Sequence, residues 1–459
     1  MTGNTLKQQR FPFEALIIDA SAPNAMFRQL EQQLREAIWE GRLQAGERLP
    51  SSRRLAEQLN VARNTVVNAY EQLAMEGFIC TSKGSGSRVT DAFPLPPKKN
   101  SSPLQSSKTE PLTPLPLSQR ATHLLTSGLS ISLAEASDTR PFHAHIPAYE
   151  EFPSDIWAQL NMRRLRQQDK QWLQKISPCG YLPLREAVAA YLGAARGLTI
   201  EPQQVVITAG AQQGIELLSK LLIDPADIAC FEEPGYTPAA NVVEMAGAKI
   251  VSIPVDAQGI QVDKLTQHVK RAKLIYVTPA CHFPLGMSLS QPRRKALLAW
   301  AQQTGAFIIE DDYNGEFRYR GRPLTTLYAM SNTQRVIFMG SFSKLLFPSL
   351  RLGYLVLPHA LVKPLATLRW FSDRHSPPLE QAVLCDFINQ GHFARHLRRM
   401  RVLYVKRQQA LLDGAKQFLT GILTVAPLDS GLHLLAHLEP GVSEQRLLAA
   451  AKEANVELT

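Results

Sequence analysis

The first ninety residues show apolar positions at helical spacing, followed by a short hairpin pattern. Apolar side chains repeat every three to four residues over 26–40, which predicts a first helix. A shorter helix is expected around residues 55–59, a tight turn at 60–62 and a third helix over 63–76. Two β-rich stretches around a Gly/Ser tip then predict a hairpin within 78–90.

Two short helices joined by a tight turn form the helix-turn-helix arrangement, whose second helix enters the DNA major groove. The predicted third helix begins with Arg63, Asn64 and Thr65, which lie off its apolar stripe. Arg pairs bidentately with guanine and Asn with adenine, and a Thr hydroxyl serves bases or phosphate. The small tip of the hairpin can approach a phosphate backbone closely, and it contains Lys83, Gly84 and Ser85.

From about residue 140 onward, short apolar runs alternate with amphipathic helical patterns such as those at 211–222 and 292–303. Runs that are apolar on both faces are typical of strands in a covered parallel sheet. The alternation predicts an α/β fold with an open, doubly wound sheet, whose ligands bind outside the carboxyl ends of the strands. The expected strands lie at residues 205–208, 228–231, 249–253, 274–277, 307–309, 336–339 and 354–357.

Residues 91–120 are rich in Pro, Ser and Lys, a composition that forms no packed core and predicts an extended linker. We therefore expect three parts: an N-terminal helical module over residues 14–90, a linker over 91–120 and a sheet domain over 121–459.

Composition narrows the class of protein only modestly. Hydrophobic residues make up 45% and charged residues 20% of the 459 positions, which is ordinary for a globular protein. The net charge of +10 favours an anionic partner. The five cysteines are scattered without a C-x-x-C pair, which argues against a disulfide framework and a metal site. With no signal peptide and no long apolar run, we expect a cytoplasmic protein with no membrane partner.

The segment GSFSKLLFPSLRLGY places one lysine in an apolar stretch. Burial destabilises the charged form of Lys344, which would leave a neutral, nucleophilic amine suited to imine formation with an aldehyde. The hydroxyls of Ser341 and Ser343 and the guanidinium of Arg351 suit a phosphate. An aldehyde that carries a phosphate describes pyridoxal 5'-phosphate.

Other strand ends provide further groups for this coenzyme. The run IIEDDY ends a strand in acids, one of which could hold a proton on the pyridine nitrogen; by chemistry alone Glu310, Asp311 and Asp312 all remain candidates. Tyr313 could donate to the phenolate oxygen, and Tyr236 could stack on the ring. The turn TAGAQQ joins a strand to a helix, whose first amides bind phosphate readily.

The stretch LPSSRRLAEQLNVARNTVVNAYEQLAMEGFICTSKGSGSRV resembles the GntR-type winged helix-turn-helix. The stretches GYLPLREAVAAYL, VVITAGAQQGIELL, EEPGY, IEDDYNGEFRY and RHLRRMRVLYVKR, with the lysine segment, resemble the fold-type I aminotransferase domain of MocR-type (GabR-like) regulators. The resemblance covers nearly the whole chain. It implies a head-to-tail homodimer that binds double-stranded operator DNA and pyridoxal phosphate.

The resemblance also implies roles for single residues. Lys344 would bind the coenzyme covalently, Asp311 would pair with its pyridine nitrogen, Tyr313 would contact its phenolate oxygen and Tyr236 would cover its ring. The phosphate would be surrounded by Ser341, Ser343, Arg351, Ala211 and Gln212. DNA contacts would come from Arg53, Arg63, Asn64, Thr65 and the wing residues Lys83, Gly84 and Ser85.

Three departures from the family pattern are visible. Ala62 stands where the family commonly has Ser, which removes a helix cap. Phe283 stands where aminotransferases carry an Asn that bonds the phenolate, which argues against efficient transamination. Relatives also continue for some tens of residues beyond position 459 and include an arginine for an amino-acid carboxylate, so we expect an incomplete C-terminal small domain.

Three functions therefore stay open. The leading interpretation is a transcriptional regulator that senses pyridoxal phosphate or its adduct with an amine or amino acid. The alternatives are a working aminotransferase with an appended DNA-binding domain, and a regulator whose coenzyme is purely structural. Within the family γ-aminobutyrate, taurine and the coenzyme itself serve as effectors, and the sequence does not choose among them.

Overall fold

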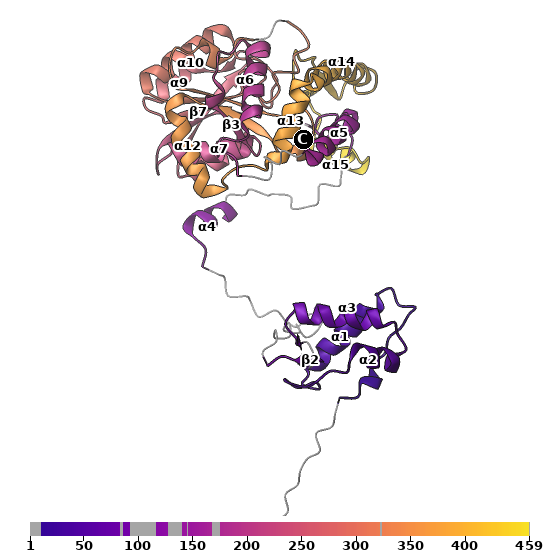
Figure 1. The fold of residues 1–459 in the computed structure, drawn as a ribbon. Coiled ribbons are helices and arrows are strands. Elements are labelled where there is room, and N and C mark those ends of the chain that lie inside the picture. Colours follow the sequence, from indigo (N-terminus) through magenta and orange to yellow (C-terminus); the bar gives the residue numbers. More distant parts are fainter. Residues whose placement is uncertain are drawn as a thin grey trace, which may run out of the picture. The chain divides into compact units, whose positions relative to one another are not determined.

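The computed structural model describes residues 11–82, 86–91, 116–126, 140–144, 146–167, 175–321 and 324–458. The chain divides into two compact units, Met1–Pro116 and Leu117–Thr459, and each is described by itself (Figure 1). The predicted linker lies mostly outside the described residues, so its boundaries and those of the flanking domains stay predictions.

The first unit consists of helices and one hairpin, close to the pattern predicted from its sequence. Its elements are η1 (Phe13–Ala15), α1 (Met26–Trp39), α2 (Ser52–Leu59), α3 (Arg63–Met75), β1 (Ile79–Ser82) and β2 (Gly86–Val89). The two strands pair antiparallel, with Ile79 opposite Val89.

Local chemistry fixes both ends of α2 and its link to α3. Ser51 caps α2, because its side chain accepts a hydrogen bond from the Arg54 amide. Asn60 ends α2 in the left-handed conformation at φ 51°, which Asn tolerates better than most residues. Tyr70 of α3 donates its hydroxyl to the Pro50 carbonyl at 3.0 Å and thereby ties α3 to the start of α2.

The interior of this unit is closed by its own side chains. Leu30, Leu34, Val66 and Leu73 are fully buried between α1 and α3, together with residues from α2 and the hairpin. Glu31 is the buried charge among them, and it forms ion pairs with Arg28 and Arg35. The unit thus has a hydrophobic core of its own.

The second unit is an α/β domain. Its helices, in chain order, are α4 (Gln119–Thr126), η2 (Tyr149–Glu151), α5 (Ser154–Arg166), α6 (Leu182–Arg196), η4 (Pro202–Gln204), α7 (Ala211–Leu222), α8 (Thr237–Met245), α9 (Val262–His268), α10 (Gln291–Thr304), α11 (Leu327–Met330), η5 (Pro348–Leu350), α12 (His359–Ser372), α13 (Pro378–Asn389), α14 (His392–Phe418) and α15 (Glu444–Glu453). The helices predicted at 211–222 and 292–303 are confirmed as α7 and α10.

An eight-stranded sheet forms the centre of this domain, in the order β3-β10-β9-β8-β7-β4-β5-β6. All seven strands expected from the sequence are present, and β6 is added at the edge. The strands are β3 (Val205–Thr208), β4 (Ile228–Glu233), β5 (Lys249–Asp256), β6 (Gly259–Ile260), β7 (Leu274–Val277), β8 (Phe307–Asp311), β9 (Val336–Ser341) and β10 (Gly353–Val356).

The sheet is mixed, whereas the apolar runs favoured a parallel one. Strands β5, β4, β7, β8 and β9 run parallel, but β10 pairs antiparallel with both β9 and β3. The reason is the connection between β9 and β10, which contains only the short η5. A parallel crossover needs about a dozen residues or more, usually including a helix. This short connection carries Ser343, Lys344 and Arg351.

Helices cover both faces of the sheet. Helices α7, α8 and α12 pack on one face, where the side chains of Tyr276, Ile309 and Met339 point. Helices α6 and α13 cover part of the opposite face, and α9 and α10 cover the rest. A smaller part comprises α14, α15 and the pair β11 (Leu423–Val425) and β12 (Ala436–Leu438). No helix in the described ranges has both the length and the apolar character needed to cross a bilayer.

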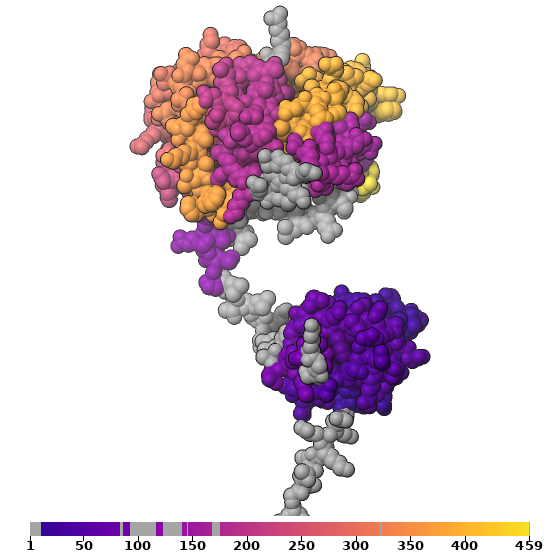
Figure 2. All heavy atoms as spheres, viewed as in Figure 1, coloured from indigo at the N-terminus to yellow at the C-terminus, as the bar shows by residue number. Residues whose placement is uncertain are grey.

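The helix α5 packs beside α13 (Figures 1 and 2). Arg164 of α5 donates to both carboxylate oxygens of Asp386 in α13, and Arg163 adds a further contact to Asp386 at 2.9 Å. These contacts join an early segment of the domain to its C-terminal part.

Candidate functional site

The predicted coenzyme residues lie along the edge of the sheet that is formed by the carboxyl ends of its parallel strands. Because β3, β4, β7, β8 and β9 all point the same way, their carboxyl ends meet there, as expected for a ligand site in an open α/β sheet. The turn after β3 contains Ala211 and Gln212, Tyr236 follows β4, Asp311 ends β8 and Ser341 ends β9.

Asp311 has one engaged and one open carboxylate oxygen. Tyr276 of β7 donates its hydroxyl to Oδ2. Oδ1 is buried and has no hydrogen-bond partner among the described residues. Burial raises the pKa of Asp311 to about 7, and Asp312 acts in the same direction, whereas the hydrogen bond from Tyr276 and the charge of Lys344 oppose the shift. A buried acceptor of this kind suits a protonated pyridine nitrogen.

The two neighbouring acids are engaged elsewhere. Glu310 points to the other face of the strand, where it accepts hydrogen bonds from the amides of Leu327 and Tyr328 at 2.8 Å and so caps α11. Asp312 forms an ion pair with Arg196 at 2.8 Å. Asp312 also has a buried oxygen without a hydrogen-bond partner in the described ranges, but its carboxylate is paired with Arg196. Of the three acids that the sequence left open, Asp311 is the one that has an open buried oxygen and interacts with the charge of Lys344.

Lys344 lies in the β9–β10 connection, beside the serine hydroxyls. Burial lowers its pKa below the usual range, and Arg351 acts in the same direction, whereas Asp311 opposes the shift. Ser341 and Ser343 are both buried. The Ser343 hydroxyl has no hydrogen-bond partner within the part of the chain that the structure describes. It is therefore available to a phosphate oxygen.

The turn between β3 and α7 forms the other side of the candidate phosphate site. Gly210 adopts φ 83° and ψ 177°, a conformation that is essentially restricted to glycine. Arg351 lies over this turn, since its Nη2 donates to the Ala209 carbonyl at 3.3 Å and a methyl group on Gly210 would lie 3.4 Å from the guanidinium. The amides of Ala211 and Gln212 belong to the first turn of α7, where intrahelical partners are lacking.

Aromatic rings line the site. Tyr236 stacks on Tyr276, with ring centroids 6.4 Å apart and 27° between the planes. Phe283 meets Tyr236 edge to face at 5.3 Å and Tyr313 at 6.2 Å. The Tyr313 hydroxyl donates to the Cys281 thiol at 3.9 Å. Burial raises the pKa values of both Tyr236 and Tyr313, and the charge of Asp311 acts in the same direction.

A buried acid fixes the loop that carries Phe283. Oε2 of Glu232 accepts hydrogen bonds from the amide and the hydroxyl of Thr278 at 3.0 and 2.9 Å. The Thr278 hydroxyl in turn accepts from the Phe283 amide at 3.0 Å. Burial raises the pKa of Glu232 to about 7. The position of the Phe283 ring is thus set by a network that starts on β4.

The structure brings every predicted coenzyme residue to this edge, but their contacts with the coenzyme stay predictions. Sequence reasoning missed two contributors. Tyr276 could have been found, because a tyrosine inside a buried strand needs a partner for its hydroxyl. The Gln213 side chain, which accepts from the Ala209 amide at 2.7 Å, gave no distinctive signal.

The predicted DNA-reading residues lie on the exposed starts of α2 and α3. Arg53, Arg63 and Asn64 are exposed and Thr65 is half-buried. The Nε of Arg63 donates to the Ser52 hydroxyl at 3.5 Å, which joins the two helix starts. Ala62 precedes α3 without a side-chain cap. Lys83, Gly84 and Ser85 lie outside the described residues.

Two further arginines flank the wing. Arg48 pairs with Arg88 of β2 in an isolated bridge, and Arg88 donates to the Gly46 carbonyl at 3.0 Å. Both side chains are exposed. The sequence placed Arg88 in the hairpin but assigned no role to either residue, because only the fold brings position 48 beside β2.

Replacing Arg63 by Ala is expected to weaken binding to the preferred DNA sequence by about 1–3 kcal/mol and to relax the choice of base at one position. The measurement is a titration of labelled duplexes at several salt concentrations. Arg42→Ala is the control, since this exposed arginine is already paired with Glu40 at 2.6 Å. An equal loss in both variants would contradict a base-reading role for Arg63.

Comparison with known proteins connects the two units to known families. Residues 147–456 match the family model described as aminotransferase class I and II. Residues 27–89 match the model described as bacterial regulatory proteins, gntR family.

Curated relatives share the full architecture. The chain is 36% identical to the probable rhizopine catabolism regulatory protein MocR of Rhizobium meliloti, over 96% of this chain and 87% of that protein. It is 33% identical to the HTH-type pyridoxine biosynthesis transcriptional regulator PdxR of Corynebacterium glutamicum, over 91% of this chain and 84% of that protein.

Solved structures resemble the second unit. Kynurenine aminotransferase of Pyrococcus horikoshii, in complex with PMP, superposes with a TM-score of 0.65 at 26% identity, over 75% of this chain and 85% of that one. LysN, the α-aminoadipate aminotransferase of Thermus thermophilus complexed with N-(5'-phosphopyridoxyl)-L-leucine, gives 0.64 at 28% identity, over 74% and 84%.

The donor set at the sheet edge fits pyridoxal phosphate. It combines a lysine of lowered pKa, an open buried carboxylate oxygen, an open serine hydroxyl and a helix N-terminus beside an arginine. The aminotransferase match gives the same coenzyme. The chain belongs to the MocR-type regulators of the GntR family, in which a GntR DNA-binding domain and a pyridoxal-phosphate aminotransferase-like domain share one polypeptide.

Proposed function

We propose that this DNA-binding regulator senses pyridoxal phosphate, or an adduct of it with a primary amine or amino acid, through its aminotransferase-like domain. One observation carries the proposal: a buried Asp311 with an open oxygen lies at the same sheet edge as Lys344, in a chain that also exposes Arg63 and Asn64 at the start of a helix-turn-helix. The site is built to hold a coenzyme, and the module is built to reach DNA.

The chemistry of the coenzyme explains how an amine could act as a signal. Pyridoxal phosphate supplies an aldehyde that exchanges between amines. Lys344 competes for that aldehyde with any primary amine that enters the site, and its lowered pKa keeps it reactive. An effector changes DNA binding only if its affinity differs between two arrangements of the protein.

Phe283 favours sensing over turnover. Its ring packs against Tyr236 and Tyr313 and brings no polar group to the phenolate side of the site. Efficient transamination benefits from a donor there, because stabilised charge on the coenzyme lowers the barrier. A working aminotransferase is therefore the second candidate and not the first.

The proposal includes a location and an assembly. A regulator must meet the chromosome, so we place the protein in the cytoplasm. We further propose a head-to-tail homodimer, as the family resemblance implies. Two modules would then read paired half-sites about one helical turn apart, or a multiple of that spacing.

The test begins with selection of the preferred duplex from a random DNA library. Affinity for that duplex is then measured at fixed salt for coenzyme-free protein, for protein loaded with pyridoxal phosphate, and for loaded protein with γ-aminobutyrate or taurine added. We expect at least one of these additions to change the affinity by about 5- to 150-fold.

Two outcomes would overturn the proposal. Equal affinity in all states, with coenzyme bound, would leave the coenzyme a structural role only. If a keto acid is added to the same samples as amino acceptor, sustained conversion of the amine to the corresponding aldehyde would favour the enzyme instead.

A further inference from the structure

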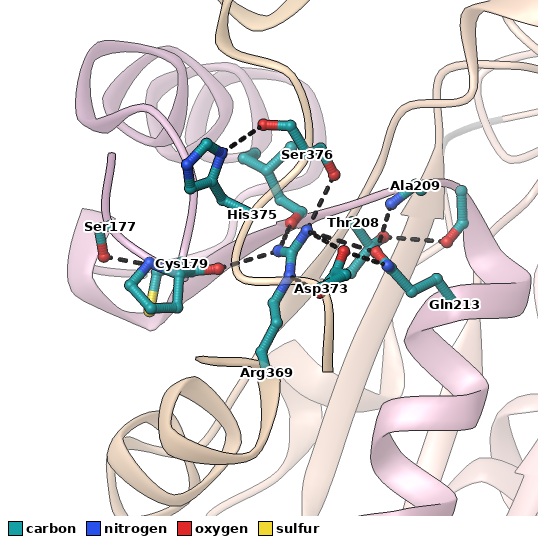
Figure 3. Close-up of polar contacts among 12 residues, drawn as sticks. Ser177, Cys179, Thr208, Ala209, Gln213, Arg369, Asp373, His375 and Ser376 are labelled. Carbon is teal, nitrogen blue, oxygen red and sulfur yellow. Dashed lines mark hydrogen bonds and ion pairs between the residues drawn. The ribbon is translucent and has the colours of Figure 1, made fainter. Parts of the chain in front are cut away.

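We propose that Arg369, Asp373 and Gln213, which we call the Arg369 clamp, set the shape of the phosphate turn and thereby give the site its preference for a phosphorylated coenzyme. The inference rests on the proposed coenzyme site and adds positioning residues to it. Arg369 belongs to α12, Asp373 follows the last residue of α12, and Gln213 belongs to α7. The three side chains meet beside the end of β3 (Figure 3).

Arg369 is fully buried and ties several chain segments together. Its Nη1 donates to the carbonyls of Pro178 and Ile207, and its Nη2 donates to the Ser376 hydroxyl at 2.9 Å. Ile207 lies on β3, just before the turn. Figure 3 shows the guanidinium at the centre of these contacts. A buried charge of this kind is retained only with such partners.

Asp373 neutralises that charge. Its Oδ1 lies 3.2 Å from Arg369 Nε, and its Oδ2 accepts from Gln213 Nε2 at 2.7 Å. Because the guanidinium is paired in this way, the clamp offers the phosphate little net charge. Its influence on the coenzyme must come from the geometry that it imposes on the turn.

Gln213 transmits that geometry. Its Oε1 accepts from the Ala209 amide at 2.7 Å and contacts Arg369 Nη2 at 3.4 Å. The side chain is therefore held at both ends, with its amide group fixed between Asp373 and the turn. The Ala209 amide is used up by this bond, which leaves phosphate binding to the amides of the next residues and to Arg351.

The turn is also held from its inner side. The Thr208 hydroxyl donates to the Gly210 carbonyl at 3.0 Å, and Arg351 lies over Gly210. The bond between Gln213 and Ala209 can be removed by a change at Gln213, which is not a residue assigned to the phosphate. Gln213 is half-buried, so its replacement does not empty the core.

The test compares two ligands that differ only in the phosphate. Coenzyme-free wild-type protein, Gln213→Leu and the control Glu216→Leu are titrated with pyridoxal phosphate and with pyridoxal, and the absorbance of the bound form is followed. Glu216 lies on the same helix, exposed and paired with Lys220 at 2.7 Å. Gln213→Met serves if the Leu variant does not fold.

We expect Gln213→Leu to lower the preference for pyridoxal phosphate over pyridoxal by about three- to tenfold, the scale of one hydrogen bond. Affinity for pyridoxal itself should stay unchanged. The coenzyme-free variant loses the hydrogen bonds of Gln213, so it should melt somewhat below wild type, in a single cooperative transition. The ³¹P resonance of bound coenzyme should shift in this variant and not in Glu216→Leu.

The possible failures are distinguishable. If wild-type protein binds neither ligand, the proposed function is wrong together with the clamp. If wild-type protein binds pyridoxal phosphate but Gln213→Leu keeps the full preference, only the clamp is wrong. A parallel loss for both ligands would mean that Gln213 is merely structural, which also overturns the inference.

Discussion

Lys344→Ala is expected to abolish covalent attachment of pyridoxal phosphate, so that the purified variant lacks the visible absorbance of the wild-type protein. The reason is chemical, because alanine offers no amine to the aldehyde. Burial lowers the pKa of Lys344, which keeps a larger neutral fraction of its amine near pH 7 than an exposed lysine has. No other coenzyme residue combines these properties.

Absorbance spectra before and after addition of excess coenzyme measure this effect. Lys363→Ala is the matched control, because Lys363 is an exposed lysine of α12. A band of wild-type intensity in Lys344→Ala would contradict the assignment. The same variant addresses the structural alternative, since unchanged DNA binding and an unchanged response without coenzyme would mean that the coenzyme carries no signal.

Asp311→Asn is expected to stabilise the coenzyme-free protein against unfolding and to weaken its binding of the coenzyme. Without coenzyme, the wild-type carboxyl is buried and its pKa is about 7 instead of its ordinary 3.8. Each unit of such a shift corresponds to about 1.4 kcal/mol, so relief of the buried charge stabilises the variant at pH 8 by about 1–4 kcal/mol. The Asn amide lacks a partner of its own, which reduces the gain.

The pH dependence follows from the direction of this shift. A pKa raised in the folded state gives a contribution to stability that is complete below the unfolded value, near pH 4, and is lost as the pH rises through about 7. Asp311→Asn should therefore flatten the fall in melting temperature between pH 4 and 8. Part of the fall in melting temperature with pH should remain, because burial also raises the pKa values of Glu232 and Glu310 to about 7.

With coenzyme bound, we expect the variant to melt below the wild-type protein. A carboxylate stabilises a protonated pyridine nitrogen, and Asn does so far less well, so the variant should bind pyridoxal phosphate more weakly. Calorimetric melting of both forms, with Glu233→Gln as an exposed acidic control at the same sheet edge, separates the two effects. If the coenzyme-free Asp311→Asn variant melts below wild type at pH 8, the conclusion that the buried Asp311 carboxylate destabilises the folded protein is wrong.

Much of this arrangement could be predicted from local sequence. Arg63 and Asn64 lie off a regular apolar stripe, and a stripe fixes which face a helix exposes. Lys344 stands alone in an apolar segment. In both cases the informative pattern spans a single element, so the chemistry of the residues could be inferred without knowledge of the packing.

Other features depend on packing between distant segments. The choice among Glu310, Asp311 and Asp312 required knowledge of what lies on each side of β8, namely Tyr276 on one face and the start of α11 on the other. Arg369 resembles any helix arginine in the sequence. Its role appears only when residues near positions 178, 207 and 213 meet around it.

The self-contained interior of the N-terminal unit has an evolutionary consequence. Leu34, Val66 and Leu73 maintain that interior, whereas Arg63 and Asn64 are exposed and support little of it. Exchanges at exposed positions usually change folding free energy by less than about 0.5 kcal/mol. Substitutions at a few exposed positions can therefore change the target genes over evolution without unfolding this unit. The coenzyme site of the other unit is unaffected by such substitutions.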